Sequence, residues 1–569
     1  MRVFIYPKMM ALGLLLAGAA WGQVNPISAT IPQTPWKVVL EEVVTIPNSL
    51  GAYPRLEELT FAPGSDDAFV LDQNGLIYRL DPWAANPSPN LFLNLSTAIP
   101  AGFRTGSQEG LRGMAFHPDF DTPGTDGYRK FYTSHSRNAF TGINFGSGVD
   151  PVIYGAPGSV HHDSYIGEWT LNANGTVNAS SYREVLLVGQ PRFDHNVGQI
   201  GFSPIAQPGD DDYGNLYIMM GDGGGANDPS NVAQNINQPL GSVLRIDPLQ
   251  NGSDPFRVPG NNPLRVSDDP STARNLIYSY GHRNPHKFSI DPVTGKFLVA
   301  DIGQANIEEI NLIEAGGNYG WDGREGTYTI NGSNVPGALP ANHPSDAFTY
   351  PVAQYDHDPE NDGPGGSWAV TGGYTYRGTE VPELTGMYLF GEFGGNRGYV
   401  FGVDVDDLVQ RDDFADLASL NGGLLSPFME LTLQLEGEGV DRSLRDIIRD
   451  TNAFAGRTDL RFGMDSRGEV YVLNKQDGKI RRIVDVIGLL EGDANRDGTV
   501  DLVDLSLLAS SFGGAGDWGS GDFNADAVVD LIDLSLLASQ FGQSSNVPEP
   551  AGVAVLSAAW LMIRRRSIV

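Results

Sequence analysis

Four polar segments of the chain combine residue types that can transfer a proton or stabilise negative charge. A neutral imidazole, as at His195, accepts a proton near pH 7, and a guanidinium, as at Arg283, stabilises a developing anion. Taken singly, His195 has the simpler interpretation of a loop histidine, and Arg283 that of a partner for an acidic neighbour. The segments indicate a site only if the fold gathers them; they are residues 108–113, 194–198, 281–285 and 301–309.

Asp222 adds a carboxylate in a turn that follows an apolar strand. It is interpreted either as the group that orients a nearby side chain or as an ordinary turn residue. The glycine-rich run 221–226 also fits a dinucleotide-binding fingerprint superficially. The sequence Asn-Asp-Pro-Ser at 227–230 then blocks the helix whose N-terminus would receive the pyrophosphate, which argues against that function.

Oxygen-bearing side chains recur with the spacing of an EF-hand calcium loop near the C-terminal end. The first loop carries Asp493, Asn495, Asp497, Thr499, Asp501 and Asp504. The second carries Asp522, Asn524, Asp526, Asp530 and Asp533. Gly498 permits the sharp turn that such a loop requires at its sixth position. Ala527 replaces this glycine in the second loop, so we expect weaker calcium binding there.

Each loop leads into an apolar helix, predicted at 505–512 and 534–541, and the duplication resembles a type I dockerin over residues 491–543. Dockerins carry their partner-reading residues where this chain has Leu502-Val503 and Leu531-Ile532. The resemblance therefore implies a cohesin-like partner. The alternative is a stabilising stalk that has no partner.

The elements that must position the first four segments come from an internal repeat. An apolar strand, a turn, a second β-rich strand and a glycine-led third strand recur six times, without helices between them. This pattern predicts an all-β, six-bladed β-propeller rather than a parallel sheet. Long insertions at 320–369 and 403–457 are typical of loops on a binding face. The units begin near Leu59, Gly113, Ile200, Lys287, Val370 and Leu460.

Composition limits the classes of protein and partner. The 569 residues exceed one typical domain, and 71 glycines with 37 prolines favour short strands joined by tight turns. A formal net charge of −32 repels phosphate backbones, so no nucleic-acid partner is expected. Because the chain has no cysteine, it has no disulfide, no thiolate metal site and no c-type haem attachment.

Both ends carry patterns typical of export. Residues 1–22 combine a basic start, an apolar run and a small-residue cleavage site, which predicts a signal peptide; a transmembrane anchor is the alternative. Residues 547–569 resemble the Pro-Glu-Pro C-terminal sorting signal of Gram-negative-type bacteria, with a plain anchor as the alternative. The apolar run at 551–563 would span roughly 20 Å as a helix, less than a bilayer core of about 30 Å. We expect a periplasmic, cell-surface or secreted protein whose only membrane contact is this segment.

Three motifs together resemble the soluble glucose/sorbosone dehydrogenase family over about residues 40–486. They are Ala-Phe-His-Pro-Asp-Phe at 115–120, Gly-His-Arg-Asn-Pro at 281–285, and the run from Asn-Leu-Ile at 311–313 to Gly-Gly-Asn-Tyr-Gly-Trp at 316–321. The resemblance implies pyrroloquinoline quinone (PQQ) held with Ca²⁺ on a six-bladed propeller.

The resemblance also implies residue roles. His195 matches the catalytic base, Asp222 the carboxylate that orients it, and Arg283 a group that stabilises charge on the quinone. Gln108, Arg283 and Asn284 match quinone contacts, while Gly303 and Gln304 occupy the place whose backbone carbonyls hold the calcium. Two departures concern the family's other cations: Arg397 stands nearest to a missing lysine, and a pair of arginines reduces to Arg457, with Arg461 as a further candidate. Gln304 also replaces a proline.

These observations predict an exported quinoprotein that oxidises the C1 hydroxyl of an aldose and passes electrons to an external acceptor. His195 and its neighbours favour this enzyme. The departures among the cations favour the alternative, a non-catalytic carbohydrate- or protein-binding propeller like that of hedgehog-interacting proteins.

Overall fold

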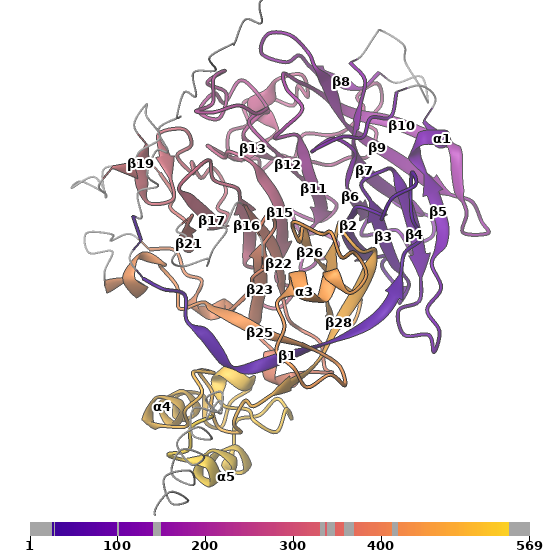
Figure 1. Ribbon diagram of the computed structural model, residues 1–569. Helices are drawn as coiled ribbons and strands as arrows, with labels where there is room; N and C mark the ends of the chain where they lie inside the picture. Colours follow the sequence, from indigo (N-terminus) through magenta and orange to yellow (C-terminus); the bar gives the residue numbers. More distant parts are fainter. Residues whose placement is uncertain are drawn as a thin grey trace, which may run out of the picture.

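The computed structural model describes residues 26–545, apart from 28, 100–101, 140–149, 331–335, 338–347, 358–368, 396 and 412–418 (Figure 1). The segments predicted as export signals, 1–22 and 547–569, lie outside the described residues. Within the described part of the chain, no helix is both long and apolar enough to cross a membrane.

The main body consists mostly of short antiparallel strands, as predicted. One sheet contains β6 (Leu111–Phe116), β7 (Lys130–Arg137), β9 (His162–Leu171), β10 (Val177–Gln190) and β8 (Val152–Tyr154). A second sheet contains β11 (Val197–Phe202), β12 (Leu216–Met220), β13 (Ser242–Ile246) and β14 (Ile277–Tyr280). A third sheet contains β15 (Pro285–Ile290), β16 (Phe297–Asp301), β17 (Ile307–Leu312) and β21 (Ala353–Asp356). A small sheet joins β18 (Arg324–Glu325), β19 (Tyr328–Ile330) and β20 (Pro336–Gly337).

A further, twelve-stranded sheet runs in three successive groups of four. In the order of pairing they are β22 (Val370–Thr375), β23 (Met387–Glu392), β24 (Val400–Asp404) and β25 (Met429–Leu435); β1 (Gln33–Thr45), β28 (Lys479–Ile487), β27 (Val470–Asn474) and β26 (Leu460–Met464); and β2 (Leu56–Phe61), β3 (Ala68–Asp72), β4 (Leu76–Leu80) and β5 (Asn90–Asn94). Helix α1 (Leu95–Ala98) follows the edge strand β5, and helix α3 (Leu444–Arg449) packs into a core shared with β1, β25 and β26.

One strand of each of the first three sheets and of each group of four lies innermost: β6, β11, β15, β22, β26 and β2 (Figure 1). Each of these strands contacts the next one around a closed ring. The order around the ring is β2, β6, β11, β15, β22, β26 and back to β2. Their neighbours, such as β12 and β27, are buried along their whole length because the sheets pack face to face. Apolar, β-branched and aromatic residues fill these strands, which suits a buried sheet. The result is a mostly β, propeller-like domain.

Strand β1, from the start of the β domain, completes a group of strands that come from the end of the domain. It pairs in parallel with β25 and antiparallel with β28, so that Lys37 faces both Thr432 and Ile487. Trp36, in the same strand, is fully buried. One sheet group therefore contains strands from both ends of the domain.

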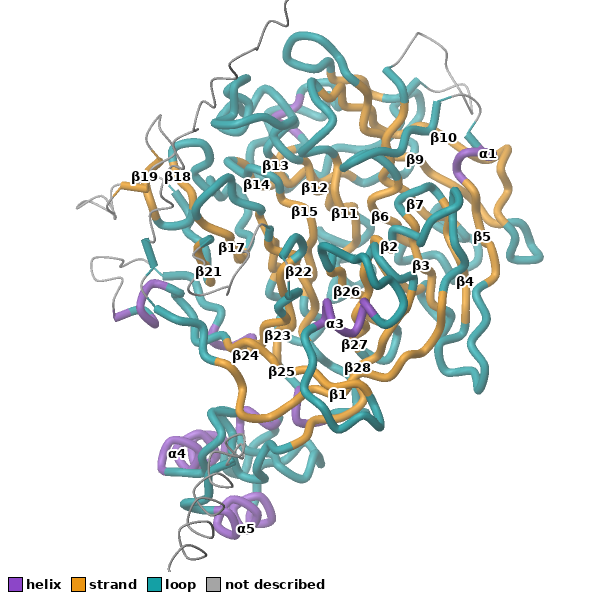
Figure 2. The backbone as a smooth tube through the Cα atoms, viewed as in Figure 1, coloured by secondary structure: helices purple, strands orange, loops and turns teal. Residues whose placement is uncertain are grey.

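A small helical unit follows β28 and contains the predicted calcium loops (Figure 2). Its helices are α4 (Leu502–Ser511) and α5 (Leu531–Gln540), which begin three residues earlier than predicted. The cause is a capping box in each loop: Asp501 and Asp530 accept hydrogen bonds from the helix N-termini, while Asp504 and Asp533 bond back. The unit has its own apolar core, centred on Leu508, Trp518, Phe523, Val529 and Leu537.

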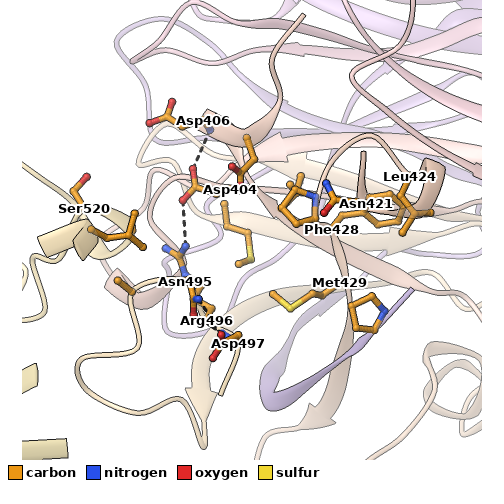
Figure 3. Close-up of a pocket in the computed structure, with 18 of the residues that line it drawn as sticks. Asp404, Asp406, Asn421, Leu424, Phe428, Met429, Asn495, Arg496, Asp497 and Ser520 are labelled. Atoms are coloured by element: carbon orange, nitrogen blue, oxygen red, sulfur yellow. Dashed lines mark hydrogen bonds and ion pairs between the residues drawn. The ribbon is translucent and has the colours of Figure 1, made fainter. Parts of the chain in front are cut away.

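The helical unit packs against the β domain through Arg496. The indole Nε1 of Trp36 donates to the Arg496 carbonyl at 2.9 Å. The Arg496 guanidinium donates to the carbonyls of Glu383 and Thr385 and pairs with Asp404 at 3.3 Å (Figure 3). A hollow of about 700 Å³ remains beside this contact.

Candidate functional site

Residues from all four polar segments meet at one end of the ring. They lie just before an innermost strand or just after the second strand of a group, and in an antiparallel sheet these positions share one end. A cavity of about 410 Å³ opens there. Its lining includes Arg55, Gln108, Arg112, His195, Arg283, Asn284, His286, Gly303, Gln304, Phe393, Arg457, Asp459, Arg461 and Lys475.

His195 and Asp222 form a buried pair at this cavity. His195 Nδ1 lies 2.6 Å from Asp222 Oδ1, and Trp321 Nε1 donates to Asp222 Oδ2 at 2.9 Å. Although burial raises the pKa of Asp222, the His195 ring and the Arg283 charge lower it below its usual range. An ionised Asp222 orients the imidazole and leaves its Nε2 for proton transfer.

The backbone of His195 is held in an unusual conformation. Its φ is +51°, in the left-handed region that non-glycine residues rarely adopt. Gln108 Oε1 accepts a hydrogen bond from His195 N at 2.9 Å. Gly221 passes so close that a Cβ there would lie 2.5 Å from the His195 carbonyl oxygen. Such strain persists only where the surroundings fix it, which is common at functional sites.

A single carboxylate fixes the loop that carries Arg283 and Asn284. Asp301 accepts hydrogen bonds from the backbone N of both residues, at 3.2 and 2.7 Å, and contacts His282 Nδ1 at 3.1 Å. Arg283 then lies 5.5 Å from the Trp321 ring and donates to the carbonyls of Ile302 and Gly303.

Glu325 fixes the neighbouring loop in the same way. Its Oε1 accepts from four successive backbone N–H groups, those of residues 304–307, at 2.7 to 3.1 Å. The Gln304 side chain pairs with Asn227 across the loop. Gly303 and Gln304 therefore lie at the cavity in a fixed backbone conformation.

Sequence reasoning missed three of the cations that line the cavity, Arg55, Arg112 and Lys475. Arg112, Arg461 and Lys475 all pair with one buried carboxylate, Glu57. Arg55 and Arg283 donate to backbone carbonyls and form no ion pair with the described residues. Lys475 directly follows β27, just as Asp222 and Gly303 follow the second strands of their groups. This position in the repeat is the signal that could have identified Lys475.

The electrostatics of this group favour an anionic ligand. Burial alone would raise the pKa of Glu57, yet Arg112, Lys475 and Arg461 hold it well below its usual range. Burial lowers the pKa of Arg112 to about 10 and that of Lys475 well below its usual value, despite Glu57. Three buried cations therefore share one carboxylate, and a bound anion would offset the cost of burying the remaining charge.

Arg457 and Arg397, the two arginines that stand in for missing cations of the family, lie in different places. Arg457 lines the cavity, pairs with Asp459 at 2.8 Å and lies over the Phe393 ring. Arg397 does not reach the cavity: its half-exposed side chain lies over Tyr399 and pairs with Glu430 at 3.4 Å. Phe393, from the same loop, lines the cavity, whereas Arg397 lines a separate hollow together with Glu430, so the structure does not bring Arg397 to the predicted quinone site.

The two predicted calcium loops have carboxylates turned inward, where they accept hydrogen bonds from their own backbones. In the first loop, Asp493 accepts from the backbone N of Asp497 and Gly498, and Asp504 accepts from those of Asn495 and Asp501. Burial, with Asp504 and Asp497 beside it, raises the pKa of Asp493 to about 7. A hard cation would relieve this repulsion and favour the ionised carboxylates that bind it.

The second predicted calcium loop repeats the hydrogen-bond pattern of the first. Asp522 accepts from Asp526 N and Ala527 N, while Asp533 accepts from Asn524 N and Asp530 N. Ala527 adopts φ +67° where the first loop has Gly498. The side chains of Asn495 and Asn524 donate to Asp497 and Asp526 at corresponding positions, and the Thr499 backbone N donates to Asp497.

Comparison with known proteins places this geometry in a family. Residues 61–417 match the glucose/sorbosone dehydrogenase family. The HIPL1 protein of Arabidopsis thaliana is 29% identical over 412 residues, which cover 65% of this chain and 54% of that protein. The human Hedgehog-interacting protein is 23% identical over 433 residues, which cover 74% and 50%. The chain thus spans about half the length of these curated relatives.

Among solved structures, the PQQ-bound form of aldose sugar dehydrogenase from Streptomyces coelicolor is 18% identical, with a TM-score of 0.45. The alignment covers 80% of this chain and 99% of that one. The family match spans more than half of the chain and confirms the resemblance predicted from the three motifs. The chain belongs to the glucose/sorbosone dehydrogenase family.

Proposed function

We propose that the six strand groups are the blades of a propeller that binds PQQ and oxidises the C1 hydroxyl of an aldose. The observation that carries this proposal is the excess of cationic side chains beside the His195–Asp222 pair. PQQ bears three carboxylates, and these cations suit a polyanion of its size. The residues therefore fit the cofactor by charge.

In this proposal the protein supplies positioning and proton transfer. His195 Nε2 takes the proton of the sugar hydroxyl, and Asp222 stabilises the imidazolium that results. Gln108, Arg283 and Asn284 hold the cofactor, with Arg457, Arg461, Arg112 and Lys475 as further partners for its carboxylates. When bound, PQQ supplies the oxidising power and accepts the hydride. An external acceptor then receives the electrons.

Calcium should bind in this cavity only together with the quinone. Among the described lining residues, Asp459 is the one carboxylate, and the Gly303 carbonyl lies beside the Arg283 guanidinium. A divalent cation alone would meet net positive charge. The carboxylates of PQQ would offset most of that charge and supply oxygen ligands, and the Gly303 and Gln304 carbonyls would supply the remaining ones.

Arg283→Ala tests the cofactor site, with Arg397→Ala as a matched control from outside the cavity. Loss of a charge-assisted contact should weaken PQQ binding by about 1.5–3 kcal/mol, or roughly 10- to 150-fold. Arg397→Ala should bind like the wild type. The measurement is a PQQ titration of the full chain with Ca²⁺, followed by the absorbance of the cofactor. Equal losses in both variants would refute the site, and no binding by the wild type would refute the enzyme.

A second candidate function is a non-catalytic propeller that binds carbohydrate or protein. It is favoured by the curated relatives, which carry the names HIPL and Hedgehog-interacting protein. A wild-type chain that binds an aldose without binding PQQ would support it. A chain that binds PQQ and reduces dye with an aldose would exclude it.

We further propose that the C-terminal unit is a dockerin-like calcium module of an exported protein. The inward carboxylates of both loops support calcium binding. Leu502, Val503, Leu531 and Ile532 are all exposed at equivalent positions of the two helices, which suits a cohesin-like partner.

A further inference from the structure

Two adjacent histidines and a glutamate form a cluster beside the catalytic cavity. His161 and His162 stand at the start of β9, and Glu109 ends the loop that precedes β6. His161 Nδ1 and His162 Nδ1 lie 3.4 and 3.5 Å from Glu109 Oε1 and 3.2 Å from each other. This cluster is separate from the His195–Asp222 pair and from both calcium loops.

The three distances match one face of a tetrahedral metal site. Zinc bonds to nitrogen and oxygen are about 2.0–2.1 Å long, so tetrahedral ligands lie roughly 3.3 Å apart. The three donor atoms of the cluster are spaced at 3.2 to 3.5 Å on every edge. The fourth corner would face the side of His161, which is the one exposed member of the cluster.

The chemistry of the cluster also suits a metal. Two imidazoles and one carboxylate form a ligand set that zinc sites use. Arg104 Nε donates to Glu109 Oε1 at 2.9 Å. Carboxylates that bind metals are commonly held by such a hydrogen bond. Arg104 is partly exposed, so solvent screens its charge.

We propose that Glu109, His161 and His162 bind a late first-row divalent metal ion. The spacing of their donor atoms fits tetrahedral zinc best and leaves one coordination position open. Imidazole ligands favour such ions over Ca²⁺ and Mg²⁺, which take oxygen ligands. The ion would tie β9 to the loop that carries Gln108. Because Gln108 Oε1 accepts from His195 N, the metal would also steady the backbone of the proposed base.

The test is Co²⁺ binding to the full chain after removal of metals with a chelator. A tetrahedral site gives an intense visible absorption, whereas the oxygen-lined calcium loops would not. We expect the wild type to show this band and to lose it, with one equivalent of bound ion, in His161→Ala and Glu109→Gln. Ser159→Ala changes an exposed neighbour outside the cluster and should keep the band.

A second measurement guards against variants that fold poorly. Zn²⁺ should raise the unfolding temperature of the wild type and of Ser159→Ala, because an ion bound only by the folded state stabilises it. It should not raise that of His161→Ala, whose own unfolding temperature without metal should equal the wild type. A band that survives in both cluster variants, or no band in the wild type, would overturn the proposal and leave a hydrogen-bonded network.

Discussion

His195→Ala should lower aldose-dependent dye reduction by about 10²–10⁴-fold, the usual contribution of a positioned general base. The expected loss is large because the sugar hydroxyl would then have no group to accept its proton. Binding of PQQ should remain nearly intact, since Gln108, Arg283 and the cavity cations lie on other segments. The rate loss should therefore appear in turnover rather than in cofactor affinity.

The two quantities are measured on one preparation of the full chain. PQQ and Ca²⁺ are titrated first, and dye reduction is then followed with a panel of aldoses. The retained PQQ affinity of His195→Ala serves as its folding control. If turnover stays within a few-fold of the wild type, His195 is not the base. If quinone binding is lost together with turnover, His195 is part of the cofactor site instead.

Removal of calcium should release the C-terminal unit from the β domain. The first loop holds Arg496 at φ +60° between Asp493 and Asp497, and Arg496 makes the main polar contacts to the β domain. Without the ion, the crowded carboxylates of Asp493, Asp497 and Asp504 repel one another. Calcium at about 100 times its Kd would stabilise the unit by about 2.7 kcal/mol, so its loss should open this contact.

The change to test is Asp493→Ala with Asp497→Ala, matched by Asp522→Ala with Asp526→Ala in the second loop. Hydrogen exchange over residues 490–545, with and without a chelator, gives the measurement. The first pair should abolish calcium-dependent protection of both the unit and the strand around Trp36. The second pair should affect α5 more than the contact, because Ala525 stands where the first loop has Arg496. Equal effects on the contact would contradict the coupling.

The repeat in the sequence predicts the strands well because each unit is built from local hairpins. The predicted fourth unit, for example, begins near Lys287, and β15 begins at Pro285. The prediction missed β1 and β25, whose partners lie far away in the chain or behind a long insertion. Nothing local marks Gln33–Thr45 as the strand that completes the last group.

In the candidate site, too, the residues that could be predicted are those whose role depends on local sequence. Residues inside contiguous motifs, such as His195 and Arg283, could be found because the motif fixes both their identity and their loop. Glu57 could not, because it lies within strand β2 and its role arises only when cations from other units converge on it. Arg397 shows the converse error: its loop reaches the cavity, but the direction of a single side chain depends on Glu430 in β25, a strand that the sequence did not reveal.

The pairing of β1 sets an order of events during synthesis. β1 is made before every other described strand of the β domain, yet its antiparallel partner β28 is made after all of them. β25 can pair with one edge of β1 earlier, but the other edge stays unpaired until β28 is made, and an unpaired edge invites association between chains. The newly made chain therefore depends on the late pairing of β1 with β28. A product truncated before Lys479 would keep most of the strands of the β domain but would lack β28, the antiparallel partner of its first strand.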